Sequence, residues 1–284
     1  MQSLDSNGDR TSQLIDPAAP LTVDQALENL RQRQDLGLRY YAAWWLGKFR
    51  VRDPEAIEAL LEALSDERDR APDGGYPLRR NAARALGKLG DRQVVPALLE
   101  CLVCEDFYVR ETAAEALGAL ADPIAIASLV QLLAGGVEAA KQAPGKPHLV
   151  QPYEAILEAL GSLQATETIP LVRPFLKHAV PRVQYAAARA MYQLTGETNY
   201  GEKLVRALQV DELQLRRSAL MDLAATDYLA AAEPISETLA ENSLKLISMK
   251  GILENHIQRE QPAEAVILLS EDTIRVMELM DTLL

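Results

Sequence analysis

The sequence has 284 residues, of which 48% are hydrophobic and 25% are charged, and these values exclude a wholly disordered chain. Its 29 basic and 41 acidic side chains give a formal net charge of −12, which disfavours general binding to nucleic acid or anionic lipid. Two cysteines cannot build a disulfide framework, and no apolar run approaches the roughly 20 residues that span a membrane. We therefore expect a cytoplasmic protein with no membrane span and no nucleic-acid partner.

The start of the chain does not resemble a targeting segment. Residues 1–20 carry three aspartates and lack the basic start and apolar stretch of a signal peptide, so a flexible N-terminal arm is predicted there. The three histidines, His148, His178 and His256, are widely separated and show no HxxxH or HExxH spacing, so no metal site is expected.

One cassette recurs along the chain and sets the interpretation of every local pattern. Copies start at residues 38, 78, 109, 153, 183 and 215, and Lys245 marks a further one. The second positions of the six copies are Arg39, Arg79, Arg110, Glu154, Gln184 and Arg216. The steps from each of these residues to the next, and from the last to Lys245, are 40, 31, 44, 30, 32 and 29 residues. The two long steps coincide with inserted loop sequence at 68–77 and 134–148, as expected when repeat arrays grow at their turns.

A second apolar-periodic segment precedes most cassettes, for example PEAIEALLEAL from Pro54. Its apolar residues recur at spacings of three and four, which predicts an amphipathic helix and no strand. Each unit is therefore a predicted helical hairpin, and one hairpin cannot bury its apolar stripe without stacked neighbours. The predicted fold is all-α: a solenoid of six to seven HEAT-like hairpins over residues 21–255, forming a right-handed superhelix with a concave groove.

The recurrent arginine is interpreted as structural. A carboxylate four residues earlier could pair with it across the turn into the helix, as Asp35 with Arg39 and Asp106 with Arg110. Alanine pairs and a glycine also recur within the cassettes and predict close approach of neighbouring helices.

The strings YYAAWWLGKFRVRDP from Tyr40 and YPLRRNAARALGKLGD from Tyr76 resemble the E-type (alpha) subunits of the phycocyanobilin lyases, within the HEAT-like repeat family of phycobilisome lyases. The resemblance covers about residues 21–255. The repeat alone is weak evidence for function, whereas the tyrosine–tryptophan string is much more specific. In solenoids of this family the second helices line the concave surface, so the resemblance implies a groove-facing stripe on each of them.

Positions three, seven and eleven of each cassette lie four residues apart and share one face of the second helix. We call this set the groove stripe, and it presents aromatic, cationic and acidic side chains in turn. It comprises Tyr40, Trp44 and Lys48 in the first unit, Arg80, Arg84 and Lys88 in the second, and Glu111, Glu115 and Ala119 in the third, and continues at Tyr185, Arg189 and Arg217.

The groove stripe suits a linear tetrapyrrole, which is flat, conjugated and carries two propionates. Aromatic side chains can pack on its rings, and cations can pair with its propionates. Glu111 or Glu115 can bond the pyrrole nitrogens or donate a proton, which makes these two the candidate catalytic groups. The alternative is a solvated face with salt bridges to these glutamates. The predicted pigment-binding residues are Tyr40, Trp44, Lys48, Arg80, Arg84 and Lys88.

By resemblance, an E-type subunit acts with an F-type (beta) partner to attach phycocyanobilin through a thioether to a cysteine of the phycocyanin alpha chain. The acceptor supplies the thiol and the pigment supplies the electrophile. The lyase is then expected to hold, orient and protonate its bound substrate, with no permanent cofactor and no nucleophile of its own. The alternatives are a non-catalytic bilin-binding protein or an interaction scaffold in phycobilisome assembly or turnover.

Several other residues receive structural interpretations. His148 is expected to be an exposed residue of the long insert, and Cys101 and Cys104 are expected to pack as small apolar residues. Tyr41 and Trp45 lie nearer the core phase of their cassette, and packing is the predicted role of Trp45.

The last part of the chain departs from the repeat. The segment PAEAVILLSEDTIRVMELMDTLL predicts one more helix with a wide apolar stripe. Residues 256–284 could cap the last core or dock the partner subunit, and the sequence favours neither.

Overall fold

The computed structural model describes residues 21–260 and 269–284, so the arm expected over residues 1–20 lies outside the described part. The helices are α1 (Val23–Arg31), α2 (Leu36–Lys48), α3 (Pro54–Leu64), α4 (Pro77–Leu89), α5 (Val95–Cys101), α6 (Phe107–Leu120), α7 (Ala125–Leu132), α8 (Gly136–Ala139), α9 (Tyr153–Ser162), α10 (Ile169–Val172), α11 (Pro181–Thr195), α12 (Thr198–Ala207), α13 (Leu213–Ala224), α14 (Ala232–Glu237), α15 (Asn242–Glu260) and α16 (Glu271–Asp281). The described ranges contain one isolated β-bridge, between Gln142 and Leu149, and no named strand, which confirms the all-α prediction.

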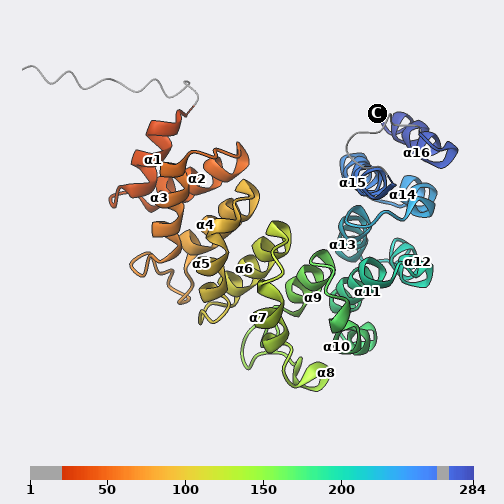
Figure 1. Ribbon diagram of the computed structural model, residues 1–284, viewed down its shortest axis with the longest axis horizontal. Coiled ribbons are helices and arrows are strands. Elements are labelled where there is room, and N and C mark those ends of the chain that lie inside the picture. The colour runs from red at the N-terminus through yellow and green to blue at the C-terminus, as the bar shows by residue number, and fades with distance from the viewer. Residues whose placement is uncertain (1–20, 261–268) are drawn as a thin grey trace, which may run out of the picture.

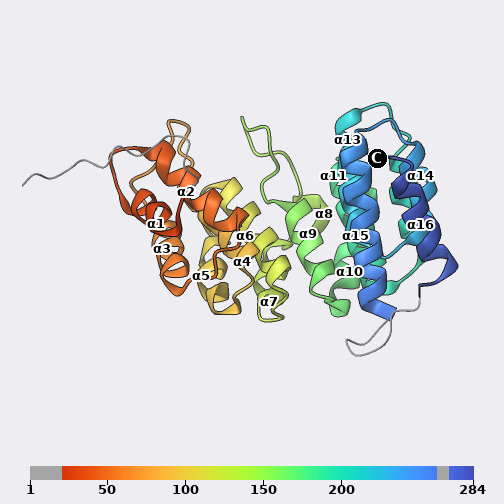
Figure 2. The ribbon, with the colours of Figure 1, turned by 90° about the horizontal axis from the view of Figure 1, so that it is seen from above.

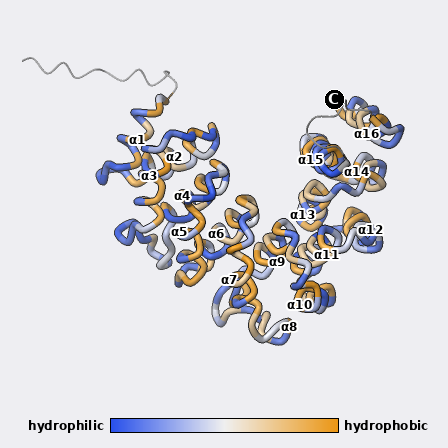
Figure 3. The backbone as a smooth tube through the Cα atoms, in the orientation of Figure 1, coloured by the Kyte–Doolittle hydropathy of each residue, from blue (hydrophilic) through white to orange (hydrophobic). Residues whose placement is uncertain are grey.

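The helices form two layers of a curved array (Figure 1). The second helices of the hairpins, α2, α4, α6, α9, α11, α13 and α15, follow the inner side of the arc, while α3, α5, α7, α10, α12 and α14 follow the outer side. Hydrophobic and hydrophilic residues alternate around most helices, as two-layer packing requires (Figure 3). Within the described ranges no helix is both long and apolar enough to cross a bilayer.

Neighbouring second helices touch through a repeated glycine–alanine contact. A Cβ added at Gly47 would lie 2.7 Å from the Cα of Ala85, and one added at Gly87 would lie 2.7 Å from the Cβ of Ala116. Gly118 meets Ala159, and Gly161 meets Ala190, in the same way. Position ten of one cassette therefore packs on position eight of the next, and we call this contact the seam.

The seam corrects the alignment of the fourth cassette. Because Gly161 occupies position ten, Tyr153 takes position two, and Glu154, predicted at position two, lies at position three. The steps on either side become 43 residues, from Arg110 to Tyr153, and 31 residues, from Tyr153 to Gln184. The insert before α9 has no period of its own, so it hid this one-residue shift.

The seam is broken between α11 and α13. Tyr192 stands at position ten where earlier units have glycine, and Asp222 stands at position eight where they have alanine. The buried apolar residues form two clusters that meet here, one running from Ala26 to Leu194 and the other from Tyr185 to Leu279. Side chains of this size cannot make the close glycine–alanine contact of the earlier units.

The recurrent arginines bind carbonyl groups in the last turn of a first helix or in the turn that follows it, which confirms their structural role. Arg39 Nε donates to the Leu30 carbonyl at 3.0 Å, and Arg110 Nη1 donates to the Cys104 carbonyl at 2.7 Å. Arg216 Nη1 bonds the Val210 carbonyl likewise, at 2.6 Å. The last carbonyls of a helix lack intrahelical partners, so these side chains join the two helices of each hairpin.

The predicted ion pairs of these arginines are wrong. Arg39 pairs with Asp66 at 2.9 Å, while Asp35 caps α2 by accepting from the Leu38 amide at 3.1 Å. Asp106 likewise caps α6 and pairs with Arg80 of the preceding unit. A carboxylate at an N-cap has its oxygen directed at backbone amides, so it faces away from a side chain one turn later.

The two inserted loops rise from the same edge of the array, where the second helices begin (Figure 2). The insert before α9 is held at both ends. Arg110 Nη2 donates to the Val150 carbonyl at 3.0 Å, and His178 Nε2 donates to the Ala140 carbonyl at 2.8 Å. The insert is therefore anchored to the array at this edge.

The C-terminal helices close the second cluster. Val276 and Leu279 of α16 are buried in it, while Ile274 and Met277 on the other face of α16 are about half exposed. α15 continues to Glu260, past the boundary expected at residue 255. Burial of one face of α16 is what a cap requires, and docking of the partner on the other face stays a prediction.

We predict that Gly87→Ala destabilises the array by roughly 1–3 kcal/mol, because the added methyl group overlaps Ala116 of the next helix. This loss opposes the gain of about 1 kcal/mol that alanine brings to a helix interior. Gly37→Ala, in the first turn of α2, meets no neighbouring helix and only the side-chain oxygen of the N-cap Asp35, at 3.1 Å, and is the control. Urea unfolding followed by circular dichroism measures both; equal midpoints would contradict the seam.

Candidate functional site

A cationic cavity of about 500 Å³ lies at the C-terminal end of α4. Arg84 and Lys88 of the groove stripe line it, together with Glu115 of α6. Arg50 and Arg52 reach it from the loop after α2. We call it the basic cavity; its other lining residues are Gly87, Gly90, Thr112, Ala116 and Ala119.

The four cations of the basic cavity form no direct pair with a described side chain, although the charge of Arg84 opposes the rise in the pKa of the neighbouring Glu115 carboxyl that burial causes. Arg50, Arg52, Arg84 and Lys88 make neither a side-chain hydrogen bond nor an ion pair within residues 21–260 and 269–284. Glu115 is the one carboxylate in the lining. In a protein of net charge −12, this unpaired concentration of positive charge favours an anionic ligand.

Sequence reasoning missed Arg50 and Arg52. Both stand in the string YYAAWWLGKFRVRDP, but they follow α2 and so lie outside any helical spacing. The signal that could have found them is their charge beside the groove stripe. Their contribution depends on how the loop turns back toward α4.

Arg80 is placed differently from Arg84. Its Nε and Nη2 atoms lie 2.9 and 2.7 Å from Oδ2 of the buried Asp106, and its guanidinium stacks 4.6 Å from the ring of Tyr108. The Tyr76 amide also donates to the same carboxylate oxygen, at 2.7 Å. These contacts, with burial opposing them, hold the pKa of Asp106 below its usual value. Arg80 thus ties α4 to the start of α6.

The aromatic residues of α2 are divided between packing and exposure. The Tyr40 hydroxyl is half buried and donates to Asp69, whereas Trp44 is 44% exposed. Lys48 is exposed and has no described partner. Trp45 packs on Phe49 with ring centroids 4.9 Å apart, which agrees with its predicted role.

Tyr41 is 48% exposed, so the prediction of a core phase is wrong for it. Positions four and eight of later units face the preceding unit, and α2 is the first helix of this kind. Tyr41 therefore meets solvent and packs at 5.5 Å on Trp44. Tyr41, Trp44, Trp45 and Phe49 make an aromatic surface at this end of the array.

A second cavity, of about 580 Å³, lies under the long insert, and we call it the insert cavity. Phe107, Tyr108 and Glu111 of α6 line one side, and Tyr153 and Glu154 of α9 line another. His148 and Lys141 of the insert and His178 and Arg182 near the start of α11 complete the lining.

Glu111 is the most perturbed member of the groove stripe in this region. Burial raises the pKa of its carboxyl to about 7, and the charges of Glu115 and Glu154 raise it further than Arg182 and Arg84 lower it. A carboxyl with this pKa holds a proton near neutral pH, which suits a general acid. Glu111 lies at the insert cavity, one helical turn before Glu115 at the basic cavity.

The corrected alignment extends the acidic part of the stripe. Glu154 and Glu158 of α9 occupy positions three and seven, and burial raises the pKa of Glu154. Arg189 lies 2.8 Å from Glu158 and 3.8 Å from Asp222. Burial also raises the pKa of Asp222, which fills the broken seam. The one-residue alignment error concealed both glutamates.

His148 is not an exposed loop residue. Its ring is half buried and stacks on Phe107 with centroids 4.0 Å apart and planes at 14°. Cys101 is buried as predicted, and burial raises the pKa of its thiol to about 12. Cys104 is half buried, 3.9 Å from Arg79.

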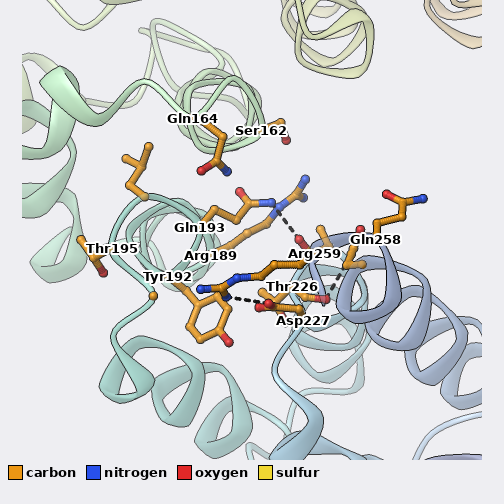
Figure 4. Close-up of a pocket in the computed structure, with 14 residues that line it drawn as sticks. Ser162, Gln164, Arg189, Tyr192, Gln193, Thr195, Thr226, Asp227, Gln258 and Arg259 are labelled. Carbon is orange, nitrogen blue, oxygen red and sulfur yellow. Dashed lines mark hydrogen bonds and ion pairs between the residues drawn. The ribbon is translucent and has the colours of Figure 1, made fainter. Parts of the chain in front are cut away.

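A third cavity, of about 720 Å³, lies at the C-terminal ends of α11 and α15 beside the broken seam. Figure 4 shows Arg189, Tyr192 and Gln193 facing Asp227 and Arg259 across it. Both guanidiniums are matched by carboxylates, Arg189 with Glu158 at 2.8 Å and Arg259 with Asp227 at 2.6 Å. This cavity therefore lacks the surplus positive charge of the basic cavity. The described residues contain no cluster of three or more His, Cys, Asp or Glu that could hold a metal ion.

Two family models match the chain. The model described as HEAT repeats matches residues 69–143 and 151–224, and the model described as PBS lyase HEAT-like repeat matches residues 38–66. The repeat prediction is therefore confirmed across most of the described array.

The chain is also similar to named proteins over nearly its full length. It is 61% identical to a phycocyanobilin lyase subunit alpha from Synechocystis sp., over 93% of this chain and 96% of that one. It is 46% identical to the bilin biosynthesis protein PecE of Mastigocladus laminosus, over 84% and 83% of the two chains. A solved structure, the complex of CpcE and CpcF of phycocyanin lyase from Nostoc sp., matches with a TM-score of 0.85, 55% identity and full coverage of both chains.

We predict that Glu111→Gln stabilises the protein more at pH 8 than at pH 5, by roughly 2 kcal/mol. A carboxyl whose folded pKa is raised stabilises the fold while protonated and loses that contribution as pH rises through about 7. Glutamine does not titrate, so the stability of the variant does not fall with this group as pH rises. Urea unfolding of both proteins at pH 5 and pH 8 measures the difference, and a pH-independent difference would show that Glu111 is not perturbed.

Proposed function

Because this chain belongs to the family of phycocyanobilin lyase alpha subunits, we propose that it binds phycocyanobilin and, with an F-type partner, attaches it to a cysteine of the phycocyanin alpha chain through a thioether. The pigment is the substrate, and the proposal requires no resident cofactor. We place the reaction in the cytoplasm.

The basic cavity is the single observation that carries this proposal. Its four unpaired cations match a ligand with two carboxylates, and guanidinium groups bind carboxylates bidentately. Arg84 and Lys88 are proposed to hold the propionates, helped by Arg50 and Arg52. Arg80 is already bound to Asp106, so its proposed role is to hold α4 in position and not to bind the pigment directly.

The rest of the pigment is proposed to lie along α6, from the basic cavity toward the insert cavity. Glu111 and Ala119 are separated by about 12 Å at 1.5 Å per residue, so an extended conjugated molecule can contact both cavities. Trp44 and Tyr40 on the neighbouring α2 offer ring faces, and Lys48 adds a further cation. Glu111, protonated near neutral pH, is proposed as the proton donor, with Glu115 bonding a pyrrole nitrogen.

The test of the function is co-expression with an F-type subunit, phycocyanobilin and the phycocyanin alpha chain. Pigment that stays on the acceptor in a denaturing gel, read by bilin fluorescence, is the expected result. Omission of either subunit is the control. Binding of pigment without covalent transfer would instead support a non-catalytic bilin-binding protein that acts in phycobilisome turnover. If the protein does not change the spectrum of the bilin, the result would support an interaction scaffold.

We predict that the double variant Arg84→Gln, Lys88→Gln weakens phycocyanobilin binding by at least about tenfold, or roughly 1.4 kcal/mol. The variant removes two charge-assisted contacts to the propionates without touching the seam. Lys177→Gln, which neutralises an exposed cation on the outer layer, is the control. An absorbance titration measures all three proteins, and unchanged affinity in the double variant would remove the propionate assignment.

Arg80→Gln is predicted to act mainly on stability. It leaves the buried carboxylate of Asp106 with only backbone donors, at a cost of about 1–3 kcal/mol in the free energy of unfolding. Urea unfolding measures this cost. A stable Arg80→Gln protein with lost pigment affinity would instead place Arg80 at the ligand.

A further inference from the structure

We propose that His148 is the general base that removes the proton from the acceptor's cysteine thiol, at the insert cavity beside Glu111. The inference rests on the proposed function and adds a group that the groove stripe does not contain. It uses the long insert, which neither the solenoid nor the pigment site explains.

The insert is constructed to hold this side chain in place. The Ala143 amide donates to the His148 carbonyl at 2.9 Å, and the Val150 amide donates to the Lys141 carbonyl at 2.9 Å, so the insert folds back on itself. Arg110, whose Nη1 holds the preceding hairpin, extends Nη2 to the Val150 carbonyl. A loop tied to the array at this point can orient a ring, whereas a free loop tip cannot.

The ring of His148 is fixed by contacts on two sides. Its face stacks on Phe107, and its edge meets the ring of Tyr108 with centroids 5.9 Å apart and planes at 76°. Tyr108 and Glu111 are three residues apart on α6 and are neighbours on its surface. His148 and Glu111 therefore both line the insert cavity, and Tyr108 lies beside each of them.

The hydrogen bond of the ring determines which nitrogen can accept a proton. Nδ1 lies 2.8 Å from the Leu149 carbonyl oxygen, and a carbonyl can only accept, so Nδ1 carries the hydrogen. In the neutral ring Nε2 is then the basic nitrogen. No hydrogen bond to Nε2 occurs within the described residues.

These groups complete the addition of a thiol to the pigment. His148 Nε2 takes the proton as the S–H bond breaks, and the sulfur electron pair forms the S–C bond at the exocyclic ethylidene carbon. The π electrons of that double bond move into the conjugated system, which takes a proton from the Glu111 carboxyl. The imidazolium returns its proton to the Glu111 carboxylate, so the net change is addition of the thiol across the double bond, with no redox step.

The charged and titratable groups facing the insert cavity come from every element around it. Besides His148 they are Tyr108 and Glu111 from α6, Tyr153 and Glu154 from α9, Arg182 and His178 near the start of α11, and Lys141 from the insert. Arg182 pairs with Glu154 at 3.0 Å. Both ring nitrogens of His178 are engaged, Nε2 as donor to the Ala140 carbonyl and Nδ1 as acceptor from the Val180 amide. Among the described residues of this cavity, His148 Nε2 is therefore the imidazole nitrogen that can still accept a proton.

The test compares wild type with His148→Phe, which keeps an aromatic ring on Phe107 but has no base. At pH 7, attachment to the phycocyanin alpha chain with the F-type subunit present should slow by about 100-fold. At pH 9.5 the acceptor thiol, with an ordinary pKa near 8.5, ionises without help, so the ratio of wild-type to variant rate should approach one. Lys146→Gln, at the tip of the same insert and outside the cavity lining, should match wild type at both pH values.

Two separate measurements distinguish this test from that of the proposed function. Phycocyanobilin affinity, from absorbance, and the melting temperature should be unchanged in His148→Phe. His148→Gln, which keeps a donor for the Leu149 carbonyl, replaces the first variant if that one unfolds, with the same expected slowing. A rate within about threefold of wild type at pH 7, or an equal deficit at both pH values, would overturn the assignment. Absence of transfer by wild type itself would overturn the proposed function instead.

Discussion

The close contact between glycine at position ten and alanine at position eight of the next unit is the constraint on which the rest of the array depends. A Cβ at Gly47, Gly87 or Gly118 would overlap the facing alanine, so the second helices can pack this closely only with these residues. The contact also fixes their relative rotation. Positions three, seven and eleven of successive helices therefore recur along the inner layer, although no residue of that stripe takes part in the seam and one of them, Tyr185, is buried.

One of the cavities lies where the glycine–alanine contact of the seam is missing. Tyr192 and Asp222 replace the small residues between α11 and α13, and the cavity of about 720 Å³ lies beside them. The basic cavity has another origin, because the seam is intact at Gly87 and the space lies between helix ends and the loop carrying Arg50 and Arg52. Volume and binding chemistry are thus separate properties of this molecule, since the larger space is the one whose arginines are already paired.

Helix α6 meets two requirements of the proposed reaction: cations that bind the pigment and an acid that donates a proton. Its later turns border cations that suit propionates, and its first turns carry a carboxyl whose pKa burial and like charges raise to about 7. The solenoid provides both surfaces through regular spacing. The insert then adds His148 from outside the repeat, because a loop can place a ring where no helical position lies.

Several features were determined by the sequence alone: the two-helix unit, its stacking, the groove stripe of the first three units and the family, because these depend on the periodicity of apolar and small residues and on one aromatic string. Tertiary structure decided which cations remain unpaired. Arg80 is bound by Asp106, which lies 26 residues later, while Arg50 and Arg52 turn back from a loop. It also decided the position of Glu154 and the stacking of His148. Such contacts join distant residues through loops without a period, so no local pattern encodes them.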